Sequence, residues 1–440
     1  MSASLELKST TAADTSASSN WRSRLLCWIL PVVCLLYIVQ LWTPLRLTGD
    51  SIVLLSMASS AADGHGFLYH GRKTQYPPGY PAMVVCLERV GAARPWGLVG
   101  LNVLFLFIGF ASSYYVVRRY FQLNSNWAVM TLLFTALSFA LIKHFTLPLT
   151  DVPFFGMSMV AVALIVRAEK EPGAWYYILL TLACLTSIAA ALVRPIAIAL
   201  LPSLAWSLGA HFRLGEILRA TQRRILIFCC ALTAVLASVS VVLLHTAYVQ
   251  GARSLLAQQG LPRGIRNILL YRLHEIGELA LNAPASKLGS VSALVWLFGA
   301  IATAVLLTCV RHCRLGVAEI YLAAYLFILF LWPYGDTRFW TPVLPLIFAA
   351  LFSSLRPWTF TGWRKQAGLL YAAAYMLMGL VALAYSTRIT FSGREFPRRY
   401  GDENIRSTYE VFYSDPKADR SRSNDCALEL LQRYSRTDRP

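Results

Sequence analysis

Long apolar runs separated by short polar loops dominate this chain. Runs of about 18 or more apolar residues are long enough to cross a bilayer as helices. Clear runs of this kind are Leu25–Trp42, Gly97–Val117, Ala174–Val193, Ile225–Leu244, Val291–Val310, Leu315–Trp332 and Ala367–Tyr385. Shorter candidates are Trp127–Ile142, Val152–Val166, Pro195–Gly209 and Trp340–Leu355. The pattern predicts an all-α, polytopic transmembrane helical protein with about eleven spans.

The composition supports this fold class. Hydrophobic residues make up 57% of the 440 residues and charged residues only 14%, and the mean hydropathy is +0.53. These values exclude a water-soluble globule. The first apolar run ends in bulky and charged residues without a small-x-small cleavage site, so we expect it to remain as an anchor.

Lysine and arginine gather on alternate loops, which sets the expected orientation. Basic loops of membrane proteins face the cytoplasm. The pattern predicts a cytoplasmic N-terminal tail (1–24), a transmembrane domain (25–385) and a short, polar external tail (386–440), in an inner (plasma) membrane. The formal net charge of +18 then reflects topology and contact with anionic membrane lipids, so we expect no nucleic-acid partner.

The first external loop is long and contains the segment GRKTQYPPGYPAM, Gly71–Met83. Adjacent prolines restrict the backbone and cannot continue a helix. We expect a rigid, tyrosine-rich corner that returns the loop to the bilayer surface, with interfacial helices beside it. Tyr76, Tyr80 and His65 of this loop are candidates for contacts with substrate or lipid; for His65, an ordinary polar loop residue is the simpler interpretation.

Carboxylates and arginines from distant parts of the chain fall at the same predicted face. Asp50 follows the first span, and Asp151 and Arg194 lie at later span ends, as does Arg338. Each has a simpler explanation, because either acid could cap a helix and either arginine could reach lipid headgroups. Their joint occurrence favours a functional site, since charge at a membrane face is costly.

A stretch between the middle spans predicts an interfacial amphipathic helix, Ile265–Leu281. External loops are normally poor in positive charge, yet Arg266 and Arg272 lie here. They predict contact with an anionic partner, which could be a lipid-linked donor or ordinary phospholipid.

The order of these features resembles the C-type membrane glycosyltransferases that use polyprenyl-phosphate sugars. The resemblance covers roughly residues 21–385 and includes protein O-mannosyltransferases, lipid A aminoarabinose transferases and lipopolysaccharide-core transferases. It rests on an acid after the first span, a Pro-Pro-aromatic corner, LTDVP at a span entrance, and an arginine-aromatic turn before PVLP. It implies that Asp50 is the catalytic carboxylate and Asp151 the second acid.

The sequence departs from the family pattern at two positions. Ser51 stands where many relatives have a second acid, which weakens the case for a tightly held metal but leaves a divalent cation open. The cysteines form no metal signature either. Tyr76 stands where many relatives have a lysine, so the donor-phosphate ligand has three candidates: Arg338, Arg194 and Lys73.

The chemistry expected of such a site needs few groups. A lipid-phosphate sugar carries a good leaving group, so one general base and positive charge near the phosphate suffice. We therefore expect transfer of a hexose or pentose from a polyprenyl-phosphate donor to a glycan, lipid or protein acceptor, by an inverting single displacement at the external (periplasmic) face of the membrane. The alternative is a transporter or flippase for a lipid-linked or anionic substrate.

Overall fold

The chain is built from helices, as the apolar pattern predicts. The computed structural model describes residues 28–213, 260–310, 315–355, 362–400, 403–413 and 423–435, with the single positions 253, 257 and 421. Within these ranges the only strand-like pairing is an isolated bridge between Tyr69 and Arg72. The expected span Ile225–Leu244 lies outside the described residues.

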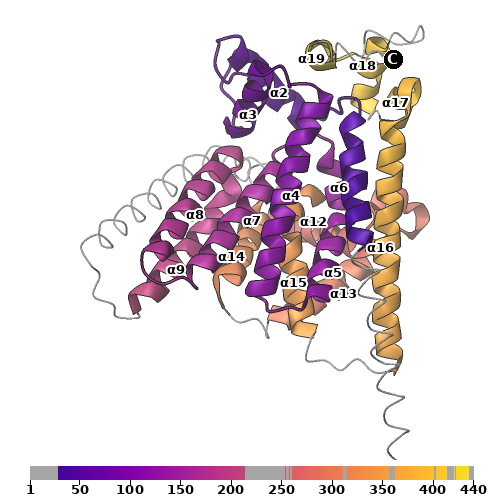
Figure 1. Ribbon diagram of the computed structural model, residues 1–440. Helices are drawn as coiled ribbons and strands as arrows, with labels where there is room; N and C mark the ends of the chain where they lie inside the picture. Colours follow the sequence, from indigo (N-terminus) through magenta and orange to yellow (C-terminus); the bar gives the residue numbers. More distant parts are fainter. Residues whose placement is uncertain are drawn as a thin grey trace, which may run out of the picture.

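Two groups of helices can be distinguished in Figure 1. The first forms the bundle: η1 (Gln40–Trp42), α4 (Pro95–Arg119), α5 (Ser125–Ala136), α6 (Phe139–Phe145), α7 (Asp151–Ala168), α8 (Ala174–Val193), η2 (Pro195–Leu200), α9 (Leu201–Arg213), α12 (Leu261–Leu281), η4 (Ala285–Lys287), η5 (Gly289–Val291), α13 (Ala293–Val310), α14 (Val317–Leu331), η6 (Thr337–Val343), α15 (Leu344–Leu355) and α16 (Gly362–Thr390). The second lies at one end of the bundle: α2 (Gly49–Ala62), α3 (Gly79–Arg89), η7 (Gly393–Glu395), α17 (Phe396–Tyr400), α18 (Glu403–Phe412) and α19 (Asp425–Ser435).

Among the described residues, fewer helices are long enough to span a membrane than the sequence pattern indicates for the whole chain. Among the described residues six helical segments are long and apolar enough to span a membrane, or seven if the pair α5 and α6, bent by 54°, is one span. The expected count of about eleven is not confirmed. Three expected spans, found as Trp28–Trp42, Pro195–Gly209 and Val317–Leu331, are shorter apolar helices of 10–17 residues. Pro195–Gly209 begins at a proline that follows Arg194, and Val317–Leu331 ends two residues before Pro333.

Helices α4 and α7 pack closely in the bundle, because small residues let their backbones approach. A Cβ atom on Gly156 of α7 would lie 2.6 Å from the Phe105 carbonyl oxygen of α4. A Cβ on Gly109 of α4 would likewise lie 2.4 Å from the ring of Phe155. This close packing holds the start of α7, where Asp151 lies, at a defined position in the bundle.

A second hydrophobic core joins the first loop to the C-terminal residues. It includes Leu54 and Tyr80 from α2 and α3, and Phe396, Tyr409 and Leu431 from the C-terminal helices, all buried. The segment 386–440 is thus, where it is described, a set of helices packed on α2 and α3. Apolar surface of amphipathic helices such as α18 and α19 is buried against the first loop, since neither helix can form a core alone.

Candidate active site

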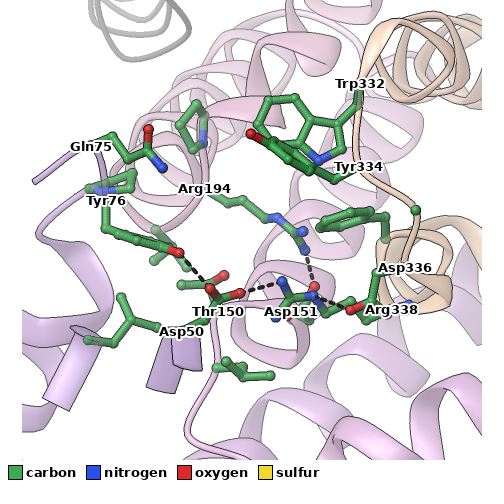
Figure 2. A pocket seen from close by; sticks show the side chains of 17 residues that line it. Asp50, Gln75, Tyr76, Thr150, Asp151, Arg194, Trp332, Tyr334, Asp336 and Arg338 are labelled. Carbon is green, nitrogen blue, oxygen red and sulfur yellow. Dashed lines mark hydrogen bonds and ion pairs between the residues drawn. The ribbon is translucent and has the colours of Figure 1, made fainter. Parts of the chain in front are cut away.

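A cavity of about 400 Å³ lies where α2, the 75–77 corner, α7, η2 and the 332–339 turn meet. Its charged lining residues are Asp50, Asp151, Arg194, Asp336 and Arg338. Figure 2 shows these side chains turned toward one another from α2, the start of α7, the residue before η2 and the 332–339 turn. The structure therefore brings together the four charged residues that the sequence placed at one face, and adds Asp336.

Asp50 is not the residue that caps its helix. The N-cap of α2 is Thr48, whose side chain accepts from the Ser51 amide, while the Ser51 hydroxyl accepts from the Thr48 amide at 2.6 Å. This reciprocal capping box satisfies the end of the helix without Asp50. The Asp50 carboxylate is left free to point into the cavity, so the simpler explanation from sequence does not account for it.

Tyr76 and Arg338 occupy the two oxygens of the Asp50 carboxylate. The Tyr76 hydroxyl donates to Oδ1 at 2.5 Å, and the Arg338 guanidinium donates to Oδ2. Burial alone would raise the pKa of Asp50, but the charge of Arg338 and the two hydrogen bonds outweigh it, so this pKa lies below its ordinary value. Burial and the neighbouring Asp50 raise the pKa of the Tyr76 hydroxyl, which stays protonated as a donor.

Asp151 forms a buried ion pair with Arg194. Asp151 is 2% exposed and Arg194 is 7% exposed, and a guanidinium nitrogen of Arg194 contacts the Asp151 Oδ1. The Phe339 ring lies beside both arginines, with its centroid 5.0 Å from the Arg194 guanidinium carbon and 5.2 Å from that of Arg338. Phe339 therefore contacts both guanidinium groups through interactions of the cation–π type.

Asp336 and His144 also belong to this site, although neither was among the site residues predicted from the sequence. Asp336 accepts from the Arg338 amide at 3.0 Å and pairs with the Arg338 Nε at 3.1 Å. The buried His144 ring places Nε2 at 3.7 Å from the same carboxylate. Burial would raise the pKa of Asp336, but His144 and Arg338 outweigh it and hold that pKa below its ordinary value. The sequence GDTR places Asp336 two residues before Arg338 and could have indicated it, whereas no local sequence pattern indicates His144.

Other candidates lie apart from the cavity lining. Lys73 is exposed on the loop, and His65 lines a different cavity, of about 690 Å³, between α2 and α19. Tyr80 is fully buried in the second core. Arg266 is exposed on α12.

Arg272 has a different environment from the one expected for a lipid contact. It is fully buried, pairs with Glu275, and donates to the carbonyl oxygens of Trp332 and Tyr334 at 3.0 and 2.5 Å. The amphipathic pattern predicted that Arg272 would contact an anionic partner, but in the structure the 332–336 turn covers it. Arg272 therefore supports the wall of the cavity.

The cavity also has a charge balance that constrains its chemistry. Asp50, Asp151 and Asp336 contribute three negative charges and Arg194 and Arg338 two positive charges, so the lining sums to −3 + 2 = −1 before His144 is counted. Across the described part of the chain, no three His, Cys, Asp or Glu side chains converge as ligands for a metal ion.

Comparison of the whole fold identifies structural relatives. ArnT from Cupriavidus metallidurans bound to undecaprenyl phosphate is similar with a TM-score of 0.53 and 14% identity, over 94% of this chain and 85% of ArnT. The apo state of the same protein gives a TM-score of 0.53 and 15% identity, over 95% and 85% of the two chains. The archaeal oligosaccharyltransferase AglB from Archaeoglobus fulgidus gives a TM-score of 0.46 and 14% identity, over 92% of this chain and 59% of AglB.

The ArnT likeness confirms the fold resemblance to the C-type membrane glycosyltransferases that the ordered motifs indicated. At this level of identity it concerns the fold alone. No protein-family model and no curated protein matches the sequence.

Proposed function

We propose that this chain is an integral-membrane glycosyltransferase that moves a sugar from a polyprenyl-phosphate donor to an acceptor nucleophile. The observation that carries the proposal is the contact between Asp50 and Arg338 inside a cavity at one end of a helical bundle. A carboxylate beside a cation supports the proposal, because this transfer needs a general base and positive charge near the phosphate. The ArnT crystal structure with undecaprenyl phosphate supports the choice of donor class.

Asp50 is the proposed base of an inverting displacement. An acceptor hydroxyl attacks the anomeric carbon as its proton passes to Asp50, and the bond from that carbon to the phosphate oxygen breaks. The electron pair leaves with the polyprenyl phosphate. Asp151 is a weaker candidate for the base, because its carboxylate is buried against Arg194; we assign it the role of orienting that arginine.

Arg338 links proton transfer to departure of the phosphate. In this structure the guanidinium is held by Asp50 and Asp336, and the cavity lining carries a net charge of −1. When Asp50 takes the acceptor proton, it loses its charge, the lining becomes neutral and Arg338 is released to pair with the leaving group. Positive charge thus becomes available at the moment when negative charge develops on the phosphate.

The experiment uses the full chain in detergent with synthetic undecaprenyl-phosphate sugars, and it measures release of undecaprenyl phosphate by mass spectrometry. Asp50→Asn keeps the size of the side chain and removes the base, so turnover should fall by about 10²- to 10⁴-fold. Glu171→Gln, which removes the charge of a residue paired with Arg167 beyond the far end of α7, is the matched control and should retain turnover. Normal turnover by folded Asp50→Asn would refute the mechanism. Donor movement across vesicles without cleavage would favour the transporter alternative.

A further inference from the structure

The segment that leads to Asp50 has no regular secondary structure of its own. Residues 43–48 run without helix or strand from η1 to α2. Most of this segment is nevertheless buried, with Leu45, Arg46 and Leu47 only 3%, 4% and 1% exposed. Buried backbone polar groups need partners, so the partners of this segment determine where α2, and with it Asp50, begins.

Those partners are side chains from the C-terminal helices. The fully buried Tyr409 hydroxyl of α18 donates to the Leu45 carbonyl at 2.9 Å and accepts from the Leu47 amide at 2.8 Å. The Tyr400 hydroxyl of α17 donates to the Leu47 carbonyl at 3.0 Å. Two tyrosines from the far end of the chain thereby satisfy three backbone groups, the last of them three residues before Asp50.

Arg46 ties the same segment to the end of α16. Its guanidinium donates to the Ser386 carbonyl and to the Thr390 hydroxyl, both at 3.0 Å, and to the Ser386 hydroxyl at 3.2 Å. The guanidinium also lies 5.6 Å from the Tyr400 ring centroid. A planar guanidinium group with several donors can hold several acceptors in a fixed arrangement. Arg46 therefore anchors the 43–48 segment on the spanning helix α16.

The other end of α2 is held by α19. Arg433 contacts both Asp63 oxygens, at 2.9 and 3.0 Å, and Glu88 of α3 at 2.8 Å from its Nε. Leu430 and Leu431 of α19 belong to the same hydrophobic core as Leu54. In Figure 1 the helices α17, α18 and α19 lie at the same end of the molecule as α2 and α3. Both ends of the helix that bears Asp50 are therefore fixed by C-terminal residues.

We propose that Tyr409 and Arg46 are positioning residues of the transfer reaction, which hold the 43–48 segment so that Asp50 meets Tyr76 and Arg338. The inference rests on the proposed function. It assigns the C-terminal helices a place in catalysis, although none of their residues lines the cavity that holds Asp50.

Two measurements on the full chain test this role. Tyr409→Phe removes only the hydroxyl, so hydrogen exchange of the Leu47 amide should become faster, while exchange in α7 should not change. In the transfer assay, kcat per folded molecule should fall by about 10- to 100-fold with KM for the donor unchanged, since a small misplacement of a reacting group costs rate without weakening binding. Arg46→Lys, which keeps the charge but loses the fork, should give a smaller loss in kcat.

Arg406→Gln is the matched control, because it breaks an exposed pair with Glu410 on the same helix α18. It should leave both readouts within twofold of the parent protein. Unchanged exchange at Leu47 in Tyr409→Phe would overturn the proposal, and this measurement requires no substrate. Faster exchange with full kcat would also overturn it while leaving the proposed function intact. Full turnover by Asp50→Asn would instead refute the base mechanism itself.

Discussion

Arg338 contacts the carboxylate of Asp50 across 288 positions of sequence, and the Arg338 side chain is in turn held by Asp336. This arrangement puts the guanidinium between two carboxylates in the first turn of η6. A monodentate ammonium could keep one of these contacts but not both with the same geometry. The pairing of base and cation is the feature from which the predictions about turnover follow.

For Arg338 we expect lysine and alanine to differ. Arg338→Lys retains the charge and loses the fork, so kcat should fall moderately, whereas Arg338→Ala removes the charge that stabilises the leaving phosphate and should lower kcat by about 10²-fold or more. Steady-state assays with the undecaprenyl-phosphate donor measure both. Arg167→Lys, in an exposed pair with Glu171 at the other end of α7, is the control. Equal and undiminished activity of both Arg338 variants would move the phosphate site to Arg194 or Lys73.

Tyr76→Phe should change the pH dependence of transfer. The Tyr76 hydrogen bond helps to hold the pKa of Asp50 below its ordinary value. Without that bond the pKa rises, so Asp50 is protonated, and inactive as a base, up to a higher pH. The acidic limb of the kcat/KM profile should therefore shift toward higher pH, since this profile reports groups of the free enzyme. If the acidic limb does not shift, the Tyr76 hydrogen bond does not control the pKa of the catalytic base.

Breaking the ion pair of Arg272 and Glu275 should lower the stability of the protein. Arg272→Met leaves a buried carboxylate without its partner, and the loss of an ion-pair partner in such a site costs about 3–5 kcal/mol. The double variant Arg272→Met, Glu275→Gln should be less destabilised. Thermal melting in detergent measures the effect, with Arg266→Gln, an exposed change on the same helix, as the control. If Arg272→Met melts like the parent protein, the turn at Trp332 and Tyr334 is held by other contacts.

The orientation predicted from the basic loops can be tested by labelling. His70 lies on the exposed loop beside α2, and Lys170 follows the far end of α7, whose first residue is Asp151. In a background with all nine cysteines replaced by serine, His70→Cys should react with an impermeant reagent in intact cells. Lys170→Cys should react only after permeabilisation. The reverse pattern would place the cavity on the cytoplasmic face.

Much of the fold follows from local sequence alone. Apolar runs such as Ala174–Val193 form helices because a helix is the structure that satisfies backbone groups in a bilayer. The count of spans could not be obtained in the same way, since several runs have borderline lengths and composition does not show where a helix bends, as between α5 and α6.

The sequence by itself determined that carboxylates and arginines would lie at ends of helices, because charge is expelled from long apolar runs. Only the tertiary structure decided which of them pair. Thr48 rather than Asp50 caps α2, His144 approaches Asp336, and Arg272 turns inward. The tail from residue 386 is too polar to form a core alone, yet it packs on the first loop through Tyr409. Such contacts join side chains far apart in sequence, and local periodicity carries no information about them.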